Sequence, residues 1–74
     1  MLEISGMSER KAALERAIKA AGGPAKLARP LGISAQAVCQ WDEVPPLRVL
    51  AVEQVSGVSR HELRPDLYPA EARA

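Results

Sequence analysis

The chain is almost without aromatic residues: Phe is absent from its 74 residues, and Trp41 and Tyr68 supply the whole aromatic fraction of 3%. A buried core must therefore be built from Leu, Ile, Val and Ala, which favours small helices in close contact. Seventy-four residues allow one domain with a small core, and such a core is only marginally stable alone. Association with a second molecule is a natural supplement.

Reactive side chains are equally scarce, since Cys39 and His61 are the single cysteine and histidine. One cysteine cannot form an intrachain disulfide, which suits a reducing cytoplasm. A metal site needs several ligands, and the sequence holds no cluster of Cys and His residues. Nothing in the sequence brings Cys39 and His61 together as a nucleophile and its base. We therefore expect no enzyme, no catalytic residue, no metal and no cofactor.

Long apolar runs are missing too, so no segment has the length of a membrane span, and the N-terminus lacks a signal-peptide layout. The net charge is only +1, which is weak support for nucleic-acid binding. The charges are unevenly spread, however. From Arg10 to Arg29 six basic residues stand against Glu15, whereas from Asp42 onward four basic residues stand against six acidic ones. Such a positive half can orient a protein toward phosphate, although mixed charge is also ordinary on surface helices.

The stretch 24–41, PAKLARPLGISAQAVCQW, predicts two short helices joined by a tight turn. We expect the first helix over about 24–31. Gly32 can take a positive φ without a Cβ penalty, as a sharp helix exit requires. Ser34 is a good N-cap for a second helix over about 35–41.

Apolar residues recur at helical spacing along both helices: Leu27, Ala28 and Leu31 share one face of the first, and Val38 and Trp41 share one face of the second. The face left outward on the second helix is short, polar and uncharged, and consists of Ser34, Ala35, Gln36, Cys39 and Gln40. A braced helix with such a face fits the major groove of DNA.

One helix is expected before this unit. Ser8 can cap it, and it should run over about 9–21. Its inward stripe consists of Leu14, Ala17, Ile18 and Ala21. Residues 1–7 fall outside the helical pattern and are interpreted as a disordered leader, as an upstream start before a true start at Met7, or as residues foreign to the natural chain. We therefore expect the domain over 8–69 and a frayed tail over 70–74.

Two helices are expected after the unit. The first should follow the double proline, run over about 46–56 and end before Gly57. Its apolar residues are too many for one narrow stripe and should be covered by the core and a second subunit; they are Leu47, Val49, Leu50, Val52 and Val55. The capping box 59–62 should start a short helix at Arg60 that ends near Arg64. The residues expected to close the bottom of the core are Leu63, Leu67 and Tyr68.

Five residues match the helix-turn-helix pattern of small, glycine and buried apolar positions: Ala28, Gly32, Ile33, Val38 and Trp41. Over roughly 17–69 the chain resembles the Cro-like repressors of temperate phages, and most of all the YdaS-like branch, whose members are often labelled antitoxins. The resemblance implies an all-α, lambda-repressor-like DNA-binding domain of four to five short helices with a central helix-turn-helix. The chain departs from the family at Pro30, which should end the first helix early or kink it because proline lacks an amide donor.

The resemblance also implies a repressor that binds a pseudo-palindromic operator as a homodimer, with two recognition helices in major grooves one turn, about 34 Å, apart. By position it implicates a set of base-reading residues: Ser34, Ala35, Gln36, Cys39 and Gln40. Glutamine can bond bidentately to adenine, and a good pairing discriminates by roughly 1–3 kcal/mol, so Gln36 and Gln40 lead this set. The alternative is a solvated helix face, with Cys39 an inert small residue.

Cations should flank the reading helix and position it on phosphate. The candidates are Lys19, Lys26, Arg29 and Arg48, and each can equally be an ordinary surface cation. Asp42 and Glu43 should repel phosphate unless they are turned away or paired with Arg48. The expected partners are double-stranded DNA and a second copy of the chain, in the cytoplasm at the nucleoid and away from membranes.

The rival interpretation is a protein-interaction module, in which the helix-turn-helix frame binds a toxin or another regulatory protein. The weak net charge, the Asp42-Glu43 pair and the crowded apolar helix after Pro46 favour it. Added salt separates the two interpretations, because it weakens DNA binding steeply and leaves an apolar interface nearly unchanged.

Overall fold

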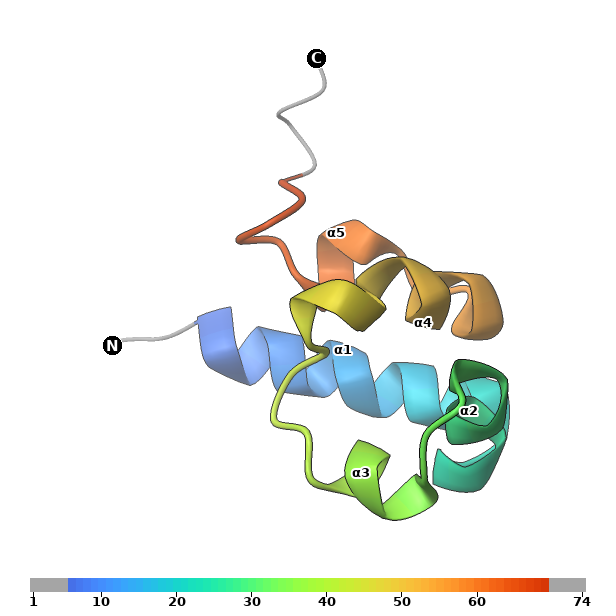
Figure 1. The fold of residues 1–74 in the computed structure, drawn as a ribbon. Coiled ribbons are helices and arrows are strands. Elements are labelled where there is room, and N and C mark those ends of the chain that lie inside the picture. The colour runs from blue at the N-terminus through green and yellow to red at the C-terminus, as the bar shows by residue number, and fades with distance from the viewer. Residues whose placement is uncertain (1–5, 70–74) are drawn as a thin grey trace.

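The computed structural model describes residues 6–69, with side chains from Glu9 onward, and within this range it is all-helical with no strand. The elements are α1 (Gly6–Ala21), α2 (Pro24–Leu31), α3 (Ala35–Cys39), the 3-10 helix η1 (Pro46–Arg48), α4 (Val49–Ser56) and α5 (Arg60–Leu63) (Figure 1). The predicted fold class, a small all-α domain with a central helix-turn-helix, is confirmed.

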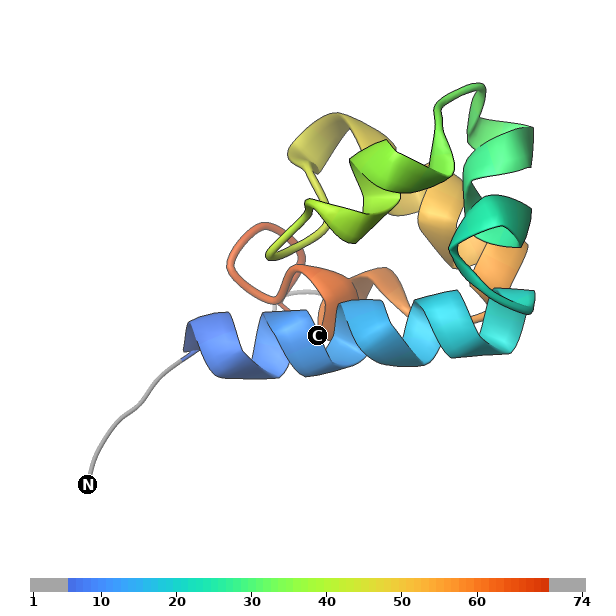
Figure 2. The ribbon, with the colours of Figure 1, turned by 90° about the horizontal axis from the view of Figure 1, so that it is seen from below.

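The long helix α1 runs along one edge of the molecule, and the remaining helices lie on one side of it (Figure 2). It contacts α2, α4 and α5, whereas α3 packs mainly on α2. Helix α3 is therefore held by its neighbour in sequence and connects to the rest of the core through α2 and the loop that follows α3.

The core is entirely aliphatic, as the lack of aromatic residues predicts. Its buried members come from every helix except η1 and from the loop before it: Ala13, Leu14, Ala17, Leu27, Ala28, Val38, Val44, Val49, Val52 and Leu63. Trp41 and Tyr68 pack against this cluster and are only partly buried. Small side chains on α1 and α2 let the two helices approach closely.

The start of α1 differs from the prediction. The helix begins at Gly6, so Ser8 lies inside it and the predicted N-cap role of Ser8 is wrong. Leu14 and Ala17 of the predicted inward stripe are fully buried, and Ile18 and Ala21 pack at the edge of the core. Of the predicted leader, Gly6 and Met7 belong to α1, and residues 1–5 lie outside the described residues, as does the predicted tail over 70–74.

The reading helix is shorter than predicted, because α3 ends at Cys39. The backbone amide of Trp41 donates to the carbonyl of Val38 at 3.1 Å, a tight turn that redirects the chain toward the core. Val44, at the end of this loop, is fully buried. Burying Val44 requires the chain to leave the helical path early, and Trp41 reaches the core from the turn rather than from the helix.

The C-terminal part largely follows the prediction. Pro46 begins a helical segment whose first turn is the 3-10 helix η1, and Gly57 ends α4 with φ 80°. The hydroxyl of Ser59 accepts a hydrogen bond from the amide of His61 at 3.0 Å and so caps α5. Leu63 and Tyr68 contact the core, but the prediction for Leu67 is wrong. Its amide donates to the carbonyl of Arg64, and this turn leaves the side chain outside.

Candidate nucleic-acid interface

The turn between α2 and α3 is built by the two local signals that the sequence contains. Gly32 has φ 74°, and its amide donates to the carbonyl of Arg29 while the amide of Ile33 donates to the carbonyl of Ala28. These two bonds satisfy carbonyls that the end of α2 would otherwise leave open. Ser34 is extended, and its Oγ accepts a hydrogen bond from the amide of Ala37 at 3.1 Å. The direction of α3 relative to α2 is thus set by Gly32, Ile33 and Ser34.

Pro30 does not end α2 early, because the helix continues to Leu31. The proline is exposed, so its ring lies in solvent rather than against another helix. The missing amide costs one hydrogen bond to the carbonyl of Lys26. The two bonds at Gly32 and Ile33 still close the helix beyond it.

Apolar contacts hold the two helices together behind the reading face. Leu27, Ala28 and Val38 are fully buried between them, and Ile33 turns inward against the same cluster. A helix of five residues is too short to be stable in isolation, so this packing and the Ser34 cap determine its position. The face opposite to Val38 is then presented to solvent on a rigid support.

Most of the predicted base-reading residues lie on that open face. Ser34, Gln36, Cys39 and Gln40 are exposed, and Ala35 is half-buried. Within residues 9–69 neither glutamine side chain hydrogen-bonds to another residue, and Cys39 is a free thiol. The amide groups of Gln36 and Gln40 are one helical turn apart, so both can reach outward from the same surface.

The predicted phosphate contacts share one property. Among the described residues, the cations that take part in no ion pair are Lys19, Lys26, Arg29 and Arg48. The first three are exposed. Arg48 is half-buried and donates from Nη1 to the carbonyl of Leu31 at 3.3 Å, which ties η1 to the end of α2. Four more guanidinium protons of Arg48 remain for another acceptor.

The other five described cations are bound to acidic side chains. Arg10 pairs with Glu43 and Arg16 pairs with Glu62, in both cases across from α1 to a later segment. The remaining pairs are Lys11 with Asp42 at 3.7 Å, Arg60 with Glu53 at 3.0 Å, and Arg64 with Asp66 at 2.7 Å. Among residues 9–69, the cations left without an ion pair are therefore the predicted phosphate-contact residues.

The ion pairs also show whether Asp42 and Glu43 are free to repel phosphate. Neither carboxylate is paired with Arg48; Glu43 binds Arg10, and Asp42 lies near Lys11. Glu43 is largely buried within its pair, so its repulsion of phosphate is weakened. Asp42 is 80% exposed in its side chain and holds only a long, solvated contact, so it keeps most of its repulsive effect.

A buried arginine that sequence reasoning missed holds the loop beyond α3. Arg64 is 7% exposed, and its Nε and Nη2 donate to the two carboxylate oxygens of Asp66 at 3.0 and 2.7 Å. Its Nη1 donates to the carbonyl of Val44 at 2.9 Å, and Nε lies 3.8 Å from a Glu43 oxygen. The bidentate hydrogen bonds from Arg64 lower the pKa of Asp66 to about 2, and the same bonds raise the pKa of Arg64.

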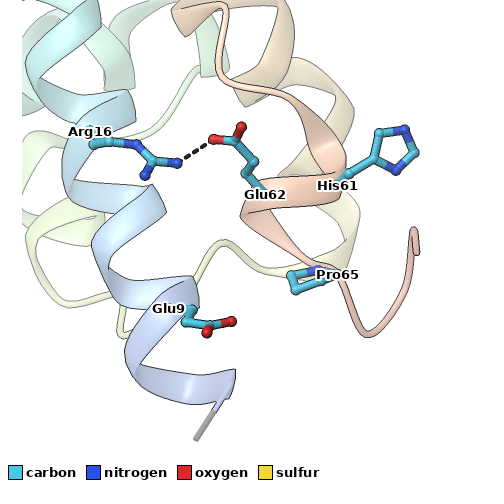
Figure 3. Close-up of a pocket in the computed structure, with 5 residues that line it drawn as sticks. All are labelled: Glu9, Arg16, His61, Glu62 and Pro65. Carbon is cyan, nitrogen blue, oxygen red and sulfur yellow. Dashed lines mark hydrogen bonds and ion pairs between the residues drawn. The ribbon is translucent and has the colours of Figure 1, made fainter. Parts of the chain in front are cut away.

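A surface hollow of about 340 Å³ lies elsewhere, between α1 and α5 (Figure 3). The ion pair between Arg16 and Glu62 crosses it, and the ring of His61 points away from that pair. His61 Nδ1 lies 2.7 Å from the carbonyl oxygen of Tyr68, so this nitrogen carries a proton and donates it. Across the part of the chain that the structure describes, no three potential metal ligands come together. Of the lining side chains, Arg16 and Glu62 are held in their ion pair, and Glu9 is a carboxylate without a second titratable group bound to it among the described residues.

Comparison with known proteins agrees with this architecture. The family described as bacterial toxin YdaS matches residues 14–72, from the middle of α1 through every later element. The chain belongs to the YdaS family. It is thus a member of a group of small helical proteins of the toxin and antitoxin kind, as its resemblance to the YdaS-like branch predicts. No curated protein and no solved structure matches it. No helix over residues 6–69 of this YdaS-family protein is long and apolar enough to cross a membrane.

Proposed function

We propose that this YdaS-family protein is a transcriptional repressor of Cro type, which binds a pseudo-palindromic operator as a homodimer with α3 in the major groove. One observation supports it above all. The four cations expected to contact phosphate are those without an ion pair among the described residues. Two of them, Lys26 and Arg29, belong to α2, the helix on which α3 packs.

An uncommitted cation favours phosphate binding for an energetic reason. A paired arginine must lose its carboxylate partner before it can contact phosphate, whereas Lys26 or Arg29 loses only water and mobile counterions. Each phosphate contact releases counterions, so the binding constant falls with salt with a logarithmic slope of about −0.9 per contact. Four contacts predict a slope of about −3.6 for one protomer. The five described cations that are held in ion pairs contribute little to this slope.

The reading face supports base recognition in the same way. Gln36 and Gln40 have no hydrogen-bond partner among the described residues, so contact with a base edge replaces water only. Both amide groups can pair bidentately with adenine. Ser34 still has its hydroxyl proton, because its oxygen serves only as the acceptor for α3. Cys39 and Ala35 complete the face. A protein seated on a promoter in this way represses by excluding the polymerase.

The proposal is tested by selecting ligands from a random pool of duplex DNA at low and near-physiological salt. We expect an enriched inverted repeat with half-sites one helical turn apart. Gln36→Ala should then weaken binding to the enriched duplex about tenfold and leave binding to unrelated duplex nearly unchanged. Lys26→Ala is the matched variant, because it should weaken binding to both duplexes and flatten the salt slope by about 1.

Two results would overturn this proposal. Equal losses on both duplexes for Gln36→Ala would remove the base-reading role of α3. Binding without any enriched sequence would leave only non-specific attraction to phosphate.

A second function is favoured by a different observation. Leu47 is 95% exposed and Leu50 47% exposed, at the start of the helix predicted to be crowded with apolar residues. These leucines fit a protein-interaction module that binds a toxin or another regulator. Such binding would persist in high salt, where the DNA complex dissociates. A complex that forms with a protein partner at both low and high salt, together with no DNA enrichment, would favour this function.

A further inference from the structure

Leu47 and Leu50 form an apolar patch on a rigid support. The two residues are three apart on η1 and the first turn of α4, so their side chains share one side of this helical segment. Val49 and Val52 are fully buried on the opposite side and anchor the segment to the core. Pro45 precedes it in an extended conformation with φ −60° and ψ 149°. The patch therefore keeps its shape without a partner.

The patch is attached directly to the proposed DNA-binding unit. Arg48 lies between the two leucines in sequence, and its guanidinium donates to the carbonyl of Leu31 at the end of α2. Figure 1 shows the segment continuing from the loop that leaves α3. Because Arg48 is also a proposed phosphate contact, the leucines lie at the border of the surface that faces the duplex.

The chemistry of the patch indicates what can cover it. Its exposed neighbours Pro46 and Gln54 are uncharged, and the acidic residue of α4, Glu53, is occupied by Arg60 at 3.0 Å. The cation beside it, Arg48, is half-buried, and its guanidinium donates to the carbonyl of Leu31 on α2. Phosphate does not cover leucine side chains, and a strongly charged partner gains nothing from them. A twofold axis brings a surface against its own copy, and leucine side chains can meet their own copies with little like-charge repulsion when Arg48 is held at α2 and neutralised by phosphate.

The dimensions of the molecule fit this arrangement. It measures 34 × 29 × 19 Å along its principal axes. Half-sites one turn apart place equivalent points of two bound copies about 34 Å apart on the same face of the duplex. Copies of this size at that spacing are close enough to touch at their borders.

We propose that Leu47 and Leu50 of one copy contact the same residues of a second copy on the adjacent half-site. This inference rests on the proposed DNA-binding function and adds the surface through which the dimer forms. Two leucines per copy bury far less than the roughly 800 Å² per partner of a stable interface. The contact is therefore too small to hold a dimer in free solution and forms when DNA brings the copies together. The result is a monomeric free protein that binds the complete operator cooperatively.

The test compares a duplex that carries one enriched half-site with a duplex that carries both. The full chain is used as wild type, as Leu47→Gln and as Leu67→Gln, the control, since Leu67 is an exposed leucine of the C-terminal turn. Wild type and both variants should bind the single half-site within about twofold of one another. On the complete site we expect the second wild-type copy to bind about tenfold more tightly than the first, a typical coupling. Leu47→Gln should lose this factor, and Leu67→Gln should keep it.

The DNA spacing provides a second readout that does not depend on folding of a variant. Inserting five base pairs between the half-sites turns them to opposite faces of the duplex, because one turn is about 10 base pairs. Wild type should then lose its cooperativity and behave as Leu47→Gln does on the natural spacing. Thermal unfolding should show that Leu47→Gln is as stable as wild type, since its side chain is exposed.

The outcomes separate the inference from the function on which it rests. Cooperativity that survives the Leu47→Gln, Leu50→Gln double variant would overturn the proposed surface and leave DNA binding intact. Equal weakening on one half-site and on the complete site would show that the leucines contact DNA, which also overturns it. Failure of wild type to bind the enriched half-site would remove the repressor function itself, and the dimer surface with it.

Discussion

Charged side chains are arranged differently on two surfaces of the molecule. One is the face formed by α2 and α3, and the other is the end formed by α1, α5 and the turn over residues 64–68. On the first, Lys26, Arg29, Gln36 and Gln40 have no side-chain partner among the described residues. At the second, Arg10, Arg16 and Arg64 are each bound to an acidic side chain, and Arg64 is the least exposed of the three. The net charge of +1 therefore hides an uncompensated positive surface. The pattern of pairing, rather than net charge, distinguishes the face proposed to bind DNA.

The end with paired charges also holds the loop after α3 in place. Arg64 binds the carbonyl of Val44, and Glu43 binds Arg10, so the loop that leaves α3 is attached to both α1 and the C-terminal turn. The paired half thus supports the half that we propose as the binding surface. Substitutions can change one half at a time.

The largest effect is expected from Arg64→Met. It leaves the carbonyl of Val44, whose bond to Arg64 is buried, and the partly exposed carboxylate of Asp66 without their donor. Breaking a buried pair by removing one partner typically costs 3–5 kcal/mol, and the partial exposure of Asp66 points to the lower end, about 3 kcal/mol. Urea denaturation measures the loss. Arg60→Met removes the more exposed pair with Glu53 and should cost about 1 kcal/mol or less. Similar losses for both variants would contradict a special role for Arg64.

The second prediction separates paired from unpaired cations in DNA binding. Arg29→Ala should weaken binding to any duplex about tenfold, because it removes one charge-assisted contact with phosphate. Arg16→Ala changes the net charge equally but removes a residue already paired with Glu62. Fluorescence anisotropy should show almost no loss for Arg16→Ala. If both variants weaken binding to the same degree, only net charge matters and the distinction between the two faces fails.

The smallest effect concerns acid stability. The pKa of Asp66 is lowered from 3.8 to about 2 in the folded protein. The pair with Arg64 therefore contributes its full stability above about pH 4, and that contribution is lost as pH falls toward 2. Because the Asp66 side chain is 40% exposed, the contribution is about 1 kcal/mol at most. Asp66→Asn should flatten the fall of the unfolding free energy between pH 4 and pH 2. An unchanged slope would show that other carboxylates govern acid unfolding.

Sequence reasoning succeeded where the signal is local. Gly32 and Ser34 act on backbone groups within five residues of themselves, so the turn between α2 and α3 could be predicted from the residue types alone. The exposed face of α3 followed from helical spacing. The end of α3 was misplaced because its cause, burial of Val44, lies several residues beyond the helix.

The charge network was beyond sequence reasoning for the same reason. Arg10 and Glu43 are 33 positions apart, and Arg64 and Val44 are 20 apart, so no spacing rule connects them. Local charge counts predicted a positive N-terminal half correctly as a sum. They could not show that Arg10 and Arg16 form ion pairs with acidic residues later in the chain, whereas Lys26 and Arg29 form none among the described residues.

The salt dependence of DNA binding tests whether Lys19, Lys26, Arg29 and Arg48, which have no ion-pair partner among the described residues, bind phosphate. The measurement uses a duplex with one enriched half-site and compares wild type with the triple variant Lys19→Gln, Lys26→Gln, Arg29→Gln. Four contacts predict a logarithmic slope of about −3.6 for wild type, and the one contact left in the variant predicts about −0.9. Equal slopes for the two proteins would contradict the claim.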